Sequence, residues 1–599
     1  MASSFQEIVV EAQTRWHDLT VGDRPWIRIG SALCGKAAGC DSVQAALESA
    51  LEAHGVQANI SQVGCIGLCF AEPLVDVQLP GGPRIFYGNV TPETAGRIIV
   101  NHVAGGVPDA ELALGYLPGV LQGTLTQGTV TEEGVPQEVD NQPEGIPNLD
   151  QHPMRALETR IVLRNAGNID PFDIYQYVAN GGYRALLKAL TEMTAEETLN
   201  RVADSGLRGR GGAAFSTGTK WKFLAGSGAP VKYILCNCEE GDPGAFNDKA
   251  ILESDPHTLL EGLILAGYAT GASNGYIFIR HGHDGPVDRC RAAVEQAREL
   301  GLWGKDILGS GFNFEVEIAL TGDSYVAGEE SGLMEAIEGK RAMPRFRPPF
   351  PAQSGLFGKP TNINNVKTLA YVPEIVSRGA EWFSSIGHDQ STGTAILCLT
   401  GALNYTGMVE VPLGTNLKDV IYQIAGGVPD GKQLKLVQTG GPLGGVLGAD
   451  SIDVVLDFEI LRSAGAIMGS GGFIVADEDT CVVDLTRALI AFCQYESCGK
   501  CFPCRMGMSH LLEVLERICQ LQGQPEDLDL MRRVGENMQA GSLCGHGQLG
   551  FNPVASALRH FGPEFETHIL DRKCTTGRCL EPRFSPRLSR RSPGASLLV

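Results

Sequence analysis

The sequence lacks long apolar runs and an excess of positive charge. No window approaches the roughly 20 consecutive apolar residues of a membrane-spanning helix. The first residues carry neither the basic region nor the apolar core of a secretory signal. Lys and Arg number 48 against 69 Asp and Glu, and the resulting net charge of −21 repels phosphate backbones. We therefore expect a cytoplasmic protein with no direct membrane insertion and no nucleic-acid partner.

Glycine, by contrast, is abundant. It accounts for 76 of 599 residues, in clusters without a collagen-like period, which indicates loops that approach a ligand closely. Hydrophobic residues make up 43% and charged residues 20%, as in ordinary folded proteins. The length predicts about four domains, and the alternation of strand-like and helix-like segments predicts an α/β multidomain fold.

The 17 cysteines are clustered, which in a reducing compartment favours metal or cluster ligands over disulfides. Cys498, Cys501 and Cys504 follow C-x2-C-x2-C spacing, and Cys544 lies further along the chain. Three thiolates at this spacing surround one face of a cubane, and a distant fourth completes it. A structural zinc site would pair two C-x2-C knuckles instead. This set therefore predicts a 4Fe-4S cluster.

A second set consists of two close pairs, Cys34 with Cys40 and Cys65 with Cys69, in the loops of a small α/β unit. Each iron of a two-iron cluster takes two thiolates, so the pairs predict a 2Fe-2S centre. Zinc is the rival interpretation, and a disulfide is less favoured.

A glycine-rich segment, GLRGRGGAAFSTGTKW, begins at Gly206. Its glycines let backbone amides approach a phosphate or a flat ring, while Arg210 and Lys220 offer positive charge. The segment is neither G-x-G-x-x-G nor a Walker loop. A tight loop that packs backbone on backbone is the alternative.

Polar residues follow the strand that precedes NCEEGDPGAF, at the edge where open α/β sheets bind ligands. Adjacent carboxylates there accept hydrogen bonds from ribose hydroxyls and repel a 2′-phosphate; a solvated acidic turn is the alternative. Later segments add aromatic, amide and acidic groups suited to a dinucleotide pocket. The candidates are Asn237, Glu239, Glu240, Asp242, Glu329, Glu330, Arg347, Phe350, Asn364 and Asn365.

Five runs occur in order between about residues 155 and 570: LRGRGGAAFSTGTKW, LCNCEEGDPGAF, YVAGEESGLMEAIEGKRAMPR, RPPFPAQSGLFGKPTNINNV and ESCGKCFPCR. Together they resemble the flavin-bearing NADH-binding subunit of respiratory complex I and its soluble relatives. These relatives include the β subunits of NAD-linked or electron-bifurcating hydrogenases, formate dehydrogenases and similar reductases. The loop SLCGHGQLGFNP is more similar to the soluble members than to the respiratory one.

The resemblance implies a particular order of domains. They are a thioredoxin-like 2Fe-2S domain (1–103), a linker (104–152), an FMN- and NAD-binding α/β domain (153–392), a β-grasp domain (393–472), a helical 4Fe-4S domain (473–570), and a candidate zinc-binding segment with a disordered basic tail (571–599).

The resemblance also implies roles for individual residues. FMN would be held by Gly209, Arg210, Gly211, Gly212, Lys220, Asn237, Glu239, Glu240, Gly328, Glu329, Asn364, Asn365 and Thr368. NAD(H) would be bound by Phe215, Phe223, Asp242, Glu330, Arg347 and Phe350, with Glu240 and Glu330 as the catalytic candidates. The chain departs from the family pattern at Ala214, Cys238, Asp242, Arg347 and Lys367, and in the five-residue spacing between Cys34 and Cys40. The choice between NAD and NADP stays open.

A third metal set is implied by the hydrogenase relatives. His568, Cys574 and Cys579, joined by Cys481, would form a Cys3His zinc site. The alternative is an idle, reduced tail.

The expected function is that of an NADH:acceptor oxidoreductase (diaphorase) subunit of a larger soluble complex. It would contain FMN, 4Fe-4S, 2Fe-2S and zinc, with a small 2Fe-2S subunit and a catalytic iron-sulfur subunit as partners. One alternative is an electron-bifurcating subunit that also uses ferredoxin. Another is a non-catalytic electron-transfer scaffold. The sequence does not name the second substrate.

Overall fold

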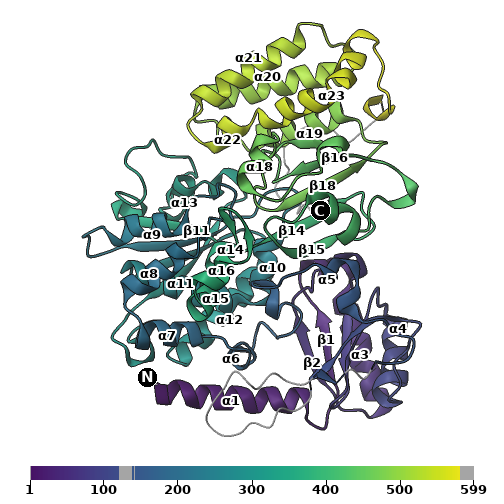
Figure 1. The fold of residues 1–599 in the computed structure, drawn as a ribbon, viewed down its shortest axis with the longest axis vertical. Helices are drawn as coiled ribbons and strands as arrows, with labels where there is room; N and C mark the ends of the chain where they lie inside the picture. The colour runs from purple at the N-terminus through teal and green to yellow at the C-terminus, as the bar shows by residue number, and fades with distance from the viewer. Residues whose placement is uncertain (1, 121–137, 140–141, 581–599) are drawn as a thin grey trace.

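The computed structural model describes residues 2–120, 138–139 and 142–580 and confirms a mixed α/β multidomain fold (Figure 1). A small N-terminal unit lies at one end of the long axis and a bundle of helices at the other. A large α/β unit and a second sheet lie between them. The basic tail lies outside the described residues, as does part of the expected linker. No helix in the described ranges is long and apolar enough to cross a membrane.

The N-terminal unit is a five-stranded sheet of order β2-β1-β3-β4-β5. Its strands are β1 (Trp26–Gly30), β2 (Asn59–Val63), β3 (Val75–Gln78), β4 (Arg84–Tyr87) and β5 (Ala113–Leu117), with helices α2 (Leu33–Ala38), α3 (Cys40–His54) and α4 (Pro92–Ile98). Helix α3 buries Val43, Leu47 and Leu51, an apolar stripe at helical spacing. Strand β5 comes from the segment that we expected to be a linker, so the sheet extends past residue 103.

Helix α1 (Ala2–Thr20) does not belong to the sheet that follows it. Its apolar residues Phe5, Val9 and Ala12 join the core of the large unit. There it lies beside α6 (Ile174–Ala179), and the guanidinium of Arg15 sits 3.9 Å from the centre of the Tyr175 ring (Figure 1). The N-terminal helix therefore fastens the first unit to the second.

The large unit contains a four-stranded sheet of order β10-β9-β8-β11, in which every neighbouring pair is parallel. The strands are β8 (Tyr233–Cys238), β9 (Asn274–Arg280), β10 (Glu315–Thr321) and β11 (Thr361–Asn365). The helices are α7 (Arg184–Glu192), α8 (Ala195–Asp204), α9 (Thr217–Ala225), α10 (Asn247–Ser254), α11 (Pro256–Thr270), α12 (Asp284–Glu299), α13 (Glu330–Ile337), α14 (Val366–Ala370), α15 (Val372–Arg378) and α16 (Ala380–Ser384). Because the strands are parallel, their carboxyl ends meet at one edge.

The second sheet has the order β15-β14-β18-β16-β17, with β14 and β18 as a parallel central pair. Its strands are β14 (Thr394–Gly401), β15 (Gly407–Pro412), β16 (Leu434–Thr439), β17 (Val446–Gly448) and β18 (Gly472–Asp477), with helix α18 (Phe458–Ser463). Strand β18 lies almost wholly beyond the expected boundary at residue 472. The sheet therefore recruits a strand from the segment that we assigned to the helical domain.

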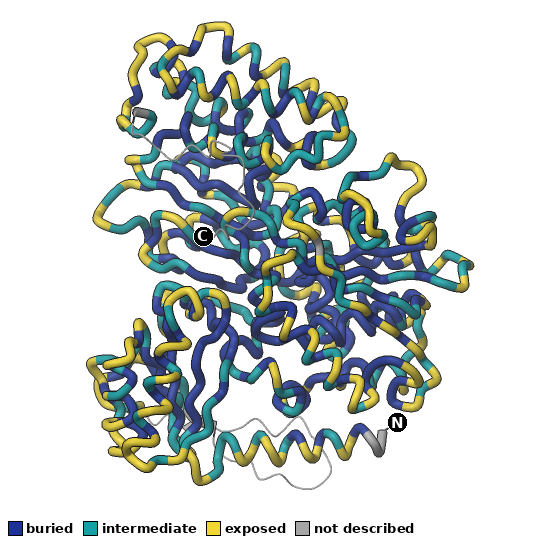
Figure 2. The backbone as a smooth tube through the Cα atoms, turned by 180° about the vertical axis from the view of Figure 1, so that it is seen from behind, coloured by how far each residue is buried: buried dark blue, intermediate teal, exposed yellow. Residues whose placement is uncertain are grey.

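The C-terminal bundle consists of α19 (Val482–Tyr495), α20 (Phe502–Cys519), α21 (Asp527–Gly541), α22 (Gly545–Leu549) and α23 (Asn552–Leu570). Helix α20 turns Leu511, Leu515 and Ile518 into the bundle core, as its apolar spacing predicts. Figure 2 shows that the bundle's outer helices alternate buried and exposed residues, whereas inner strands such as β1 and β14 are almost continuously buried. The sheets are therefore the rigid base from which the loops project.

Candidate functional site

Side chains from four segments meet at the carboxyl edge of the parallel sheet. Strand β8 ends in Asn237, whose amide donates to the carbonyl of Gly328 at 2.8 Å. The next residue but one, Glu239, has a nearly inaccessible side chain and pairs with Arg280 at 2.7 Å. Burial raises the pKa of Glu239 to about 8 although Arg280 opposes the shift. Strand β8 thus places two polar groups where ligands of parallel sheets bind.

The neighbouring strand β11 adds an amide pair to this edge. Asn364 accepts a hydrogen bond from the indole of Trp221 at 3.1 Å, which fixes its side chain in the core. Asn365 caps α14 through the backbone amide of Lys367 and contacts Asp248 at 2.5 Å. Both predicted FMN residues therefore have fixed orientations.

The glycine-rich loop packs directly over this edge. A Cβ atom added at Gly211 would lie 2.9 Å from the Cβ of Asn365, so only glycine allows this approach. The backbone N–H of Arg210 donates to Thr368 at 2.9 Å. Gly212 has φ of +116° and Ala214 has φ of +52°. The backbone thus adopts the left-handed region even at Ala214, which carries a Cβ atom.

Arg210 differs from the expected phosphate-binding role. Its guanidinium is buried and donates to the carbonyl oxygens of Thr392, Thr394 and Arg208. Because the guanidinium is bound to three carbonyl oxygens, it cannot extend toward a ligand at the strand edge. Gly209 likewise closes the loop by donating to the carbonyl of Phe215 at 2.8 Å. Arg210 and Gly209 therefore hold the loop in shape.

Lys220, one turn into α9, adds positive charge to the edge. Its ammonium donates to the carbonyl of Ile363 at 2.7 Å and lies 3.3 Å from Glu330. Arg347 approaches the same Glu330 at 3.0 Å. The adjacent Glu329 caps α13 through the amides of Ser331 and Gly332, at 2.9 Å each, and also contacts Arg347. Both acids contact Arg347, and Glu330 also pairs with Lys220.

Glu240, one of the two catalytic candidates, is committed to the backbone. Its carboxylate oxygens accept from the amides of Asp248 and Lys249 at 2.8 and 2.9 Å, at the start of α10. Burial, reinforced by Asp248, raises its pKa to about 7. Lys367, a departure from the family pattern, lies 2.9 Å from Asp248. These contacts give Glu240 a positioning role.

Asp242 reaches the second sheet. Its carboxylate accepts from the hydroxyl of Ser470 at 2.7 Å, and burial raises its pKa. The neighbouring hydroxyl of Tyr325 also favours the charged form of this carboxylate and so opposes the rise in its pKa. Asp242 therefore links the strand edge to the second sheet and to the segment that carries Tyr325.

The expected NAD-binding phenylalanines are exposed. Phe215 is 52% exposed, Phe223 59% and Phe350 53%. Phe215 precedes α9, and Phe223 lies on that helix. Exposed rings beside the glycine loop offer flat apolar surfaces for stacking.

The four cysteines of the cubane set line one pocket in the bundle. Cys498, Cys501, Cys504 and Cys544 share it with Val326, Pro344 and His546. Cys501 precedes α20 and Cys544 precedes α22, so two helix N-termini point at the pocket. This donor set fits a 4Fe-4S cluster.

A short segment joins the pocket to the sheet edge. Val326 lines the cysteine pocket, and Gly328, two residues later, binds Asn237 at the strand end. Tyr325 packs against the ring of His546, and its amide donates to Glu496 at 2.9 Å. The segment 325–330 therefore borders both sites. Tyr325 and Glu496 lie in two of the runs that carry the family resemblance, but the sequence does not show that they contact each other, because they lie far apart in the chain.

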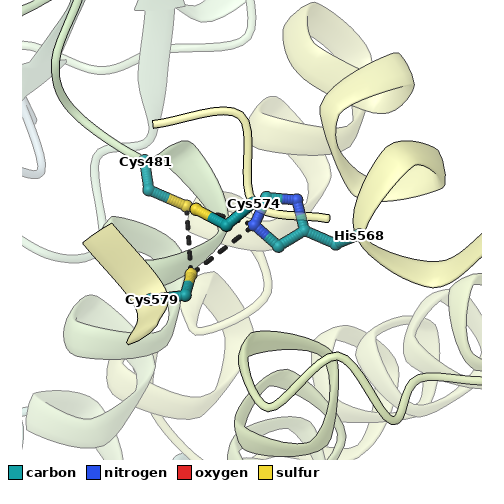
Figure 3. A group of neighbouring side chains, drawn as sticks. All are labelled: Cys481, His568, Cys574 and Cys579. Carbon is teal, nitrogen blue, oxygen red and sulfur yellow. Dashed lines mark hydrogen bonds between the residues drawn. The ribbon is translucent and has the colours of Figure 1, made fainter. Parts of the chain in front are cut away.

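The third set is assembled as expected. The ligand atoms of Cys481, His568, Cys574 and Cys579 lie within 4.8 Å of one another (Figure 3). Cys481 contacts Cys579 at 3.3 Å and the Nε2 atom of His568 at 3.4 Å. The Nδ1 atom of His568 lies 2.7 Å from the carbonyl of Glu564, which directs Nε2 at the thiols. A Cys3His set of this size fits tetrahedral zinc.

In the N-terminal unit, three of the four expected ligands lie together. The sulfur atoms of Cys34, Cys65 and Cys69 lie within 4.8 Å of one another. Cys40 is not in this group; its thiol, at the start of α3, lies 3.7 Å from Asp41. Proximity in the sequence therefore does not bring Cys40 to the other three.

Comparisons with known proteins identify two family segments in the chain. The Nuo51 FMN-binding domain matches residues 202–374, and the NADH-ubiquinone oxidoreductase-F iron-sulfur binding region matches residues 484–568. The chain is 46% identical over 422 residues to the NADP-reducing hydrogenase subunit HndC of Solidesulfovibrio fructosivorans, a match covering 70% of this chain and 86% of that protein. It is 43% identical over 414 residues to an NADH-quinone oxidoreductase subunit of Rhizobium meliloti, covering 69% and 98% respectively.

A solved structure extends the likeness over nearly the whole chain. A chain of the NAD+-reducing [NiFe]-hydrogenase in the H2-reduced state aligns with a TM-score of 0.61 at 26% identity, covering 97% of this chain and 93% of that one. The glycine loop and the strand-edge residues fall within the first matched family segment, and the cubane cysteines fall within the second.

Proposed function

Since the chain belongs to the family of the FMN-binding NADH-quinone oxidoreductase subunits and the related hydrogenase subunits, we propose that it is the NADH:acceptor oxidoreductase (diaphorase) subunit of a larger soluble complex. The observation that carries this proposal is the segment 325–330, which borders both the strand-edge site and the four-cysteine pocket. The site that donates electrons and the site that accepts them would then border the same segment. This arrangement suits electron transfer from one to the other.

FMN, when bound, supplies the acceptance of hydride and the release of single electrons, which side chains do not. Gly211 lets the backbone of the loop approach Asn365 at the strand edge, where FMN would bind. Lys220 offers positive charge, and Asn237 and Asn365 offer polar groups at the strand ends. The protein's part is to bind and orient the cofactor and to exclude water.

For the nucleotide, we propose that Phe215, Phe223 and Phe350 present stacking surfaces and that Glu330 lies beside the nicotinamide. Asp242 would lie near the ribose, where a carboxylate disfavours a 2′-phosphate, and this favours NAD over NADP. The carboxylate of Glu330 forms ion pairs with the side chains of Lys220 and Arg347.

The remaining cofactors belong to this proposal as well. Cys481, His568, Cys574 and Cys579 would hold zinc, and the N-terminal thiols would hold a 2Fe-2S cluster as a branch toward a partner. A small 2Fe-2S subunit and a catalytic iron-sulfur subunit are the expected partners, in the cytoplasm. The names of the relatives favour a hydrogenase or a quinone reductase as the complex.

The first test is the cofactor content of the anaerobically purified chain with its co-purifying subunits. We expect about one FMN, six irons and one zinc per chain, together with NADH-dye reductase activity. Cys501→Ser should remove about four irons, whereas Cys290→Ser, in the core of the large unit, should keep them. Full iron occupancy without flavin or NADH-dye activity would instead support the non-catalytic scaffold. Ferredoxin reduced together with a second substrate would support bifurcation.

Glu330→Gln tests the nucleotide site separately. Loss of the charge that faces Lys220 and Arg347 should lower kcat/KM for NADH about 5- to 30-fold, equivalent to about 1–2 kcal/mol. FMN and iron contents should not change. Glu335→Gln, on the same helix but paired with Arg345, is the matched control. Loss of iron in Glu330→Gln would contradict the assigned role.

A further inference from the structure

Lys367 places a buried ammonium group between the large unit and the second sheet. The residue lies at the start of α14 and is 2% exposed. Three oxygen atoms surround its Nζ atom: Oδ1 of Asn247 at 2.6 Å, Oδ1 of Asp248 at 2.9 Å and the carbonyl of Ser470 at 3.0 Å. Asn247 and Asp248 begin α10, and Ser470 lies just before β18. The ammonium therefore connects α14 and α10 to the second sheet.

One arm of this network ends at the strand edge. The Oδ2 atom of Asp248 accepts a hydrogen bond from the side-chain amide of Asn365 at 2.5 Å. Asn365 is also the residue that the glycine loop approaches at Gly211. Because the ion pair with Lys367 holds the carboxylate of Asp248, it also holds the amide of Asn365 below the loop.

The other arm ends at Asp242. The side-chain amide of Asn247 donates to the carbonyl of Ser470 at 2.9 Å, the same oxygen that the ammonium of Lys367 binds. The hydroxyl of Ser470 in turn donates to Asp242 at 2.7 Å. Lys367 therefore helps to fix the residue that orients Asp242.

The charge of Lys367 is matched to buried carboxylates. Asp248 is 4% exposed and Glu240 5% exposed, and the backbone N–H of Asp248 donates to Glu240 at 2.8 Å. Burial lowers the pKa of Lys367, but the two carboxylates more than offset this effect and raise the pKa above its ordinary value. The ammonium is therefore charged. Its removal would leave Asp248 buried without its ion pair, which is costly.

We propose that Lys367 is a positioning residue that orients Asn365 toward FMN and Asp242 toward the nucleotide at the same time. It acts on Asn365 through Asp248 and on Asp242 through Ser470. This role depends on the proposed function, in which Asn365 belongs to the FMN site and Asp242 to the nucleotide site. One buried charge thus serves both binding sites.

The test uses the full-length chain and measures the Kd of FMN, by fluorescence titration of the flavin-free protein, and the kinetic constants for NADH at saturating FMN. Lys367→Met removes the charge and keeps a long, unbranched side chain. We expect it to raise the Kd of FMN about 10-fold and the KM for NADH about 5-fold. The kcat should stay within about 2-fold, because both arms act on binding.

Lys232→Met is the matched control. Lys232 is also buried in the large unit, but it precedes β8 at the opposite edge of the sheet, where its ammonium donates to the carbonyls of Ala225 and Thr270 at 3.1 Å each. We expect this variant to leave the Kd of FMN and the KM for NADH unchanged.

The double variant Lys367→Met/Asp248→Asn separates the two arms. The amide introduced at position 248 carries no charge that needs a partner, and its oxygen can still accept from Asn365. The Kd of FMN should return to within about 3-fold of the unmodified value. The KM for NADH should stay raised, because Ser470 still lacks the ammonium. This variant also gives the answer if Lys367→Met alone does not fold.

Unchanged Kd and KM in Lys367→Met would overturn the proposal. Equal loss of FMN affinity in the single and double variants, or an equal effect of Lys232→Met, would overturn it as well, because Lys367 would then only support the fold. Absence of FMN binding and NADH-dye activity in the unmodified chain would refute the diaphorase assignment and this proposal with it, whereas the outcomes above refute this proposal alone.

Discussion

Gly211 shows how a single residue controls access to the strand edge. Its Cα lies so close to Asn365 that an added methyl group would come within 2.9 Å of the Asn365 Cβ. Since Asn365 is tied to α14 and to Asp248, it has little freedom to move aside. The close packing of the glycine loop over β11 therefore depends on the missing side chain.

We expect Gly211→Ala to weaken FMN binding about 5- to 100-fold, corresponding to about 1–3 kcal/mol of steric strain. Fluorescence titration of the flavin-free protein with FMN measures the effect. Gly228→Ala is the control, because an added Cβ there meets nothing within 4 Å. Equal FMN affinity in the two variants would show that the loop does not pack over the flavin.

At the scale of elements, buried polar groups join segments that are distant in the sequence. Glu410 on β15 accepts the backbone amides of Ile161, Val162 and Leu163 at 2.9 to 3.2 Å, and so holds the entry of the large unit against the second sheet. His257 at the start of α11 contacts the hydroxyl of Tyr183 at 3.0 Å. Burial lowers the pKa of His257 to about 4.

His257 gives a prediction for pH dependence. The unfolded chain protonates this residue below about pH 6.5, whereas the folded chain does so only near pH 4. The neutral, buried imidazole therefore makes its full contribution to the free energy of unfolding above pH 6.5. This contribution is lost as the pH falls from 6.5 toward 4, by about 2 kcal/mol at pH 5. Thermal unfolding at pH 7 and pH 5 should show a smaller difference in Tm for His257→Gln than for the unmodified chain. The exposed His54 provides the control, His54→Gln, and an equal pH response in both variants would contradict the prediction.

At the scale of the whole molecule, the candidate metal-binding segments also connect parts of the chain that are distant in the sequence. The loop between Cys65 and Cys69 pairs with the second sheet, where the amide of Met408 donates to Gly67 at 2.9 Å. In the bundle, the Cys3His set joins the start of α19 to the end of α23 and the segment beyond it (Figure 3). Metal bound there would close the bundle between its first and last helices.

Removal of zinc should therefore destabilise the bundle. We expect His568→Ala to lose about one zinc and to lower the Tm of the bundle by about 5 °C or more, because metal binding contributes directly to folding. FMN and cubane iron should remain. Metal analysis with calorimetry measures both effects, and His510→Ala, on the exposed face of α20, is the control. Unchanged zinc in His568→Ala would refute the site.

The sequence by itself indicated the cubane cysteines through their spacing and the glycine loop through its composition, and the family resemblance implied the order of the main units. It also indicated the Cys3His set, through the resemblance to hydrogenases. Only the tertiary structure decided that α1 joins the large unit and that β5 and β18 extend their sheets past the expected boundaries. It also turned the guanidinium of Arg210 away from the ligand edge and placed the ammonium of Lys367 between Asp248 and Ser470. These features depend on long-range packing and on where buried charge finds its partners, which residue spacing does not encode.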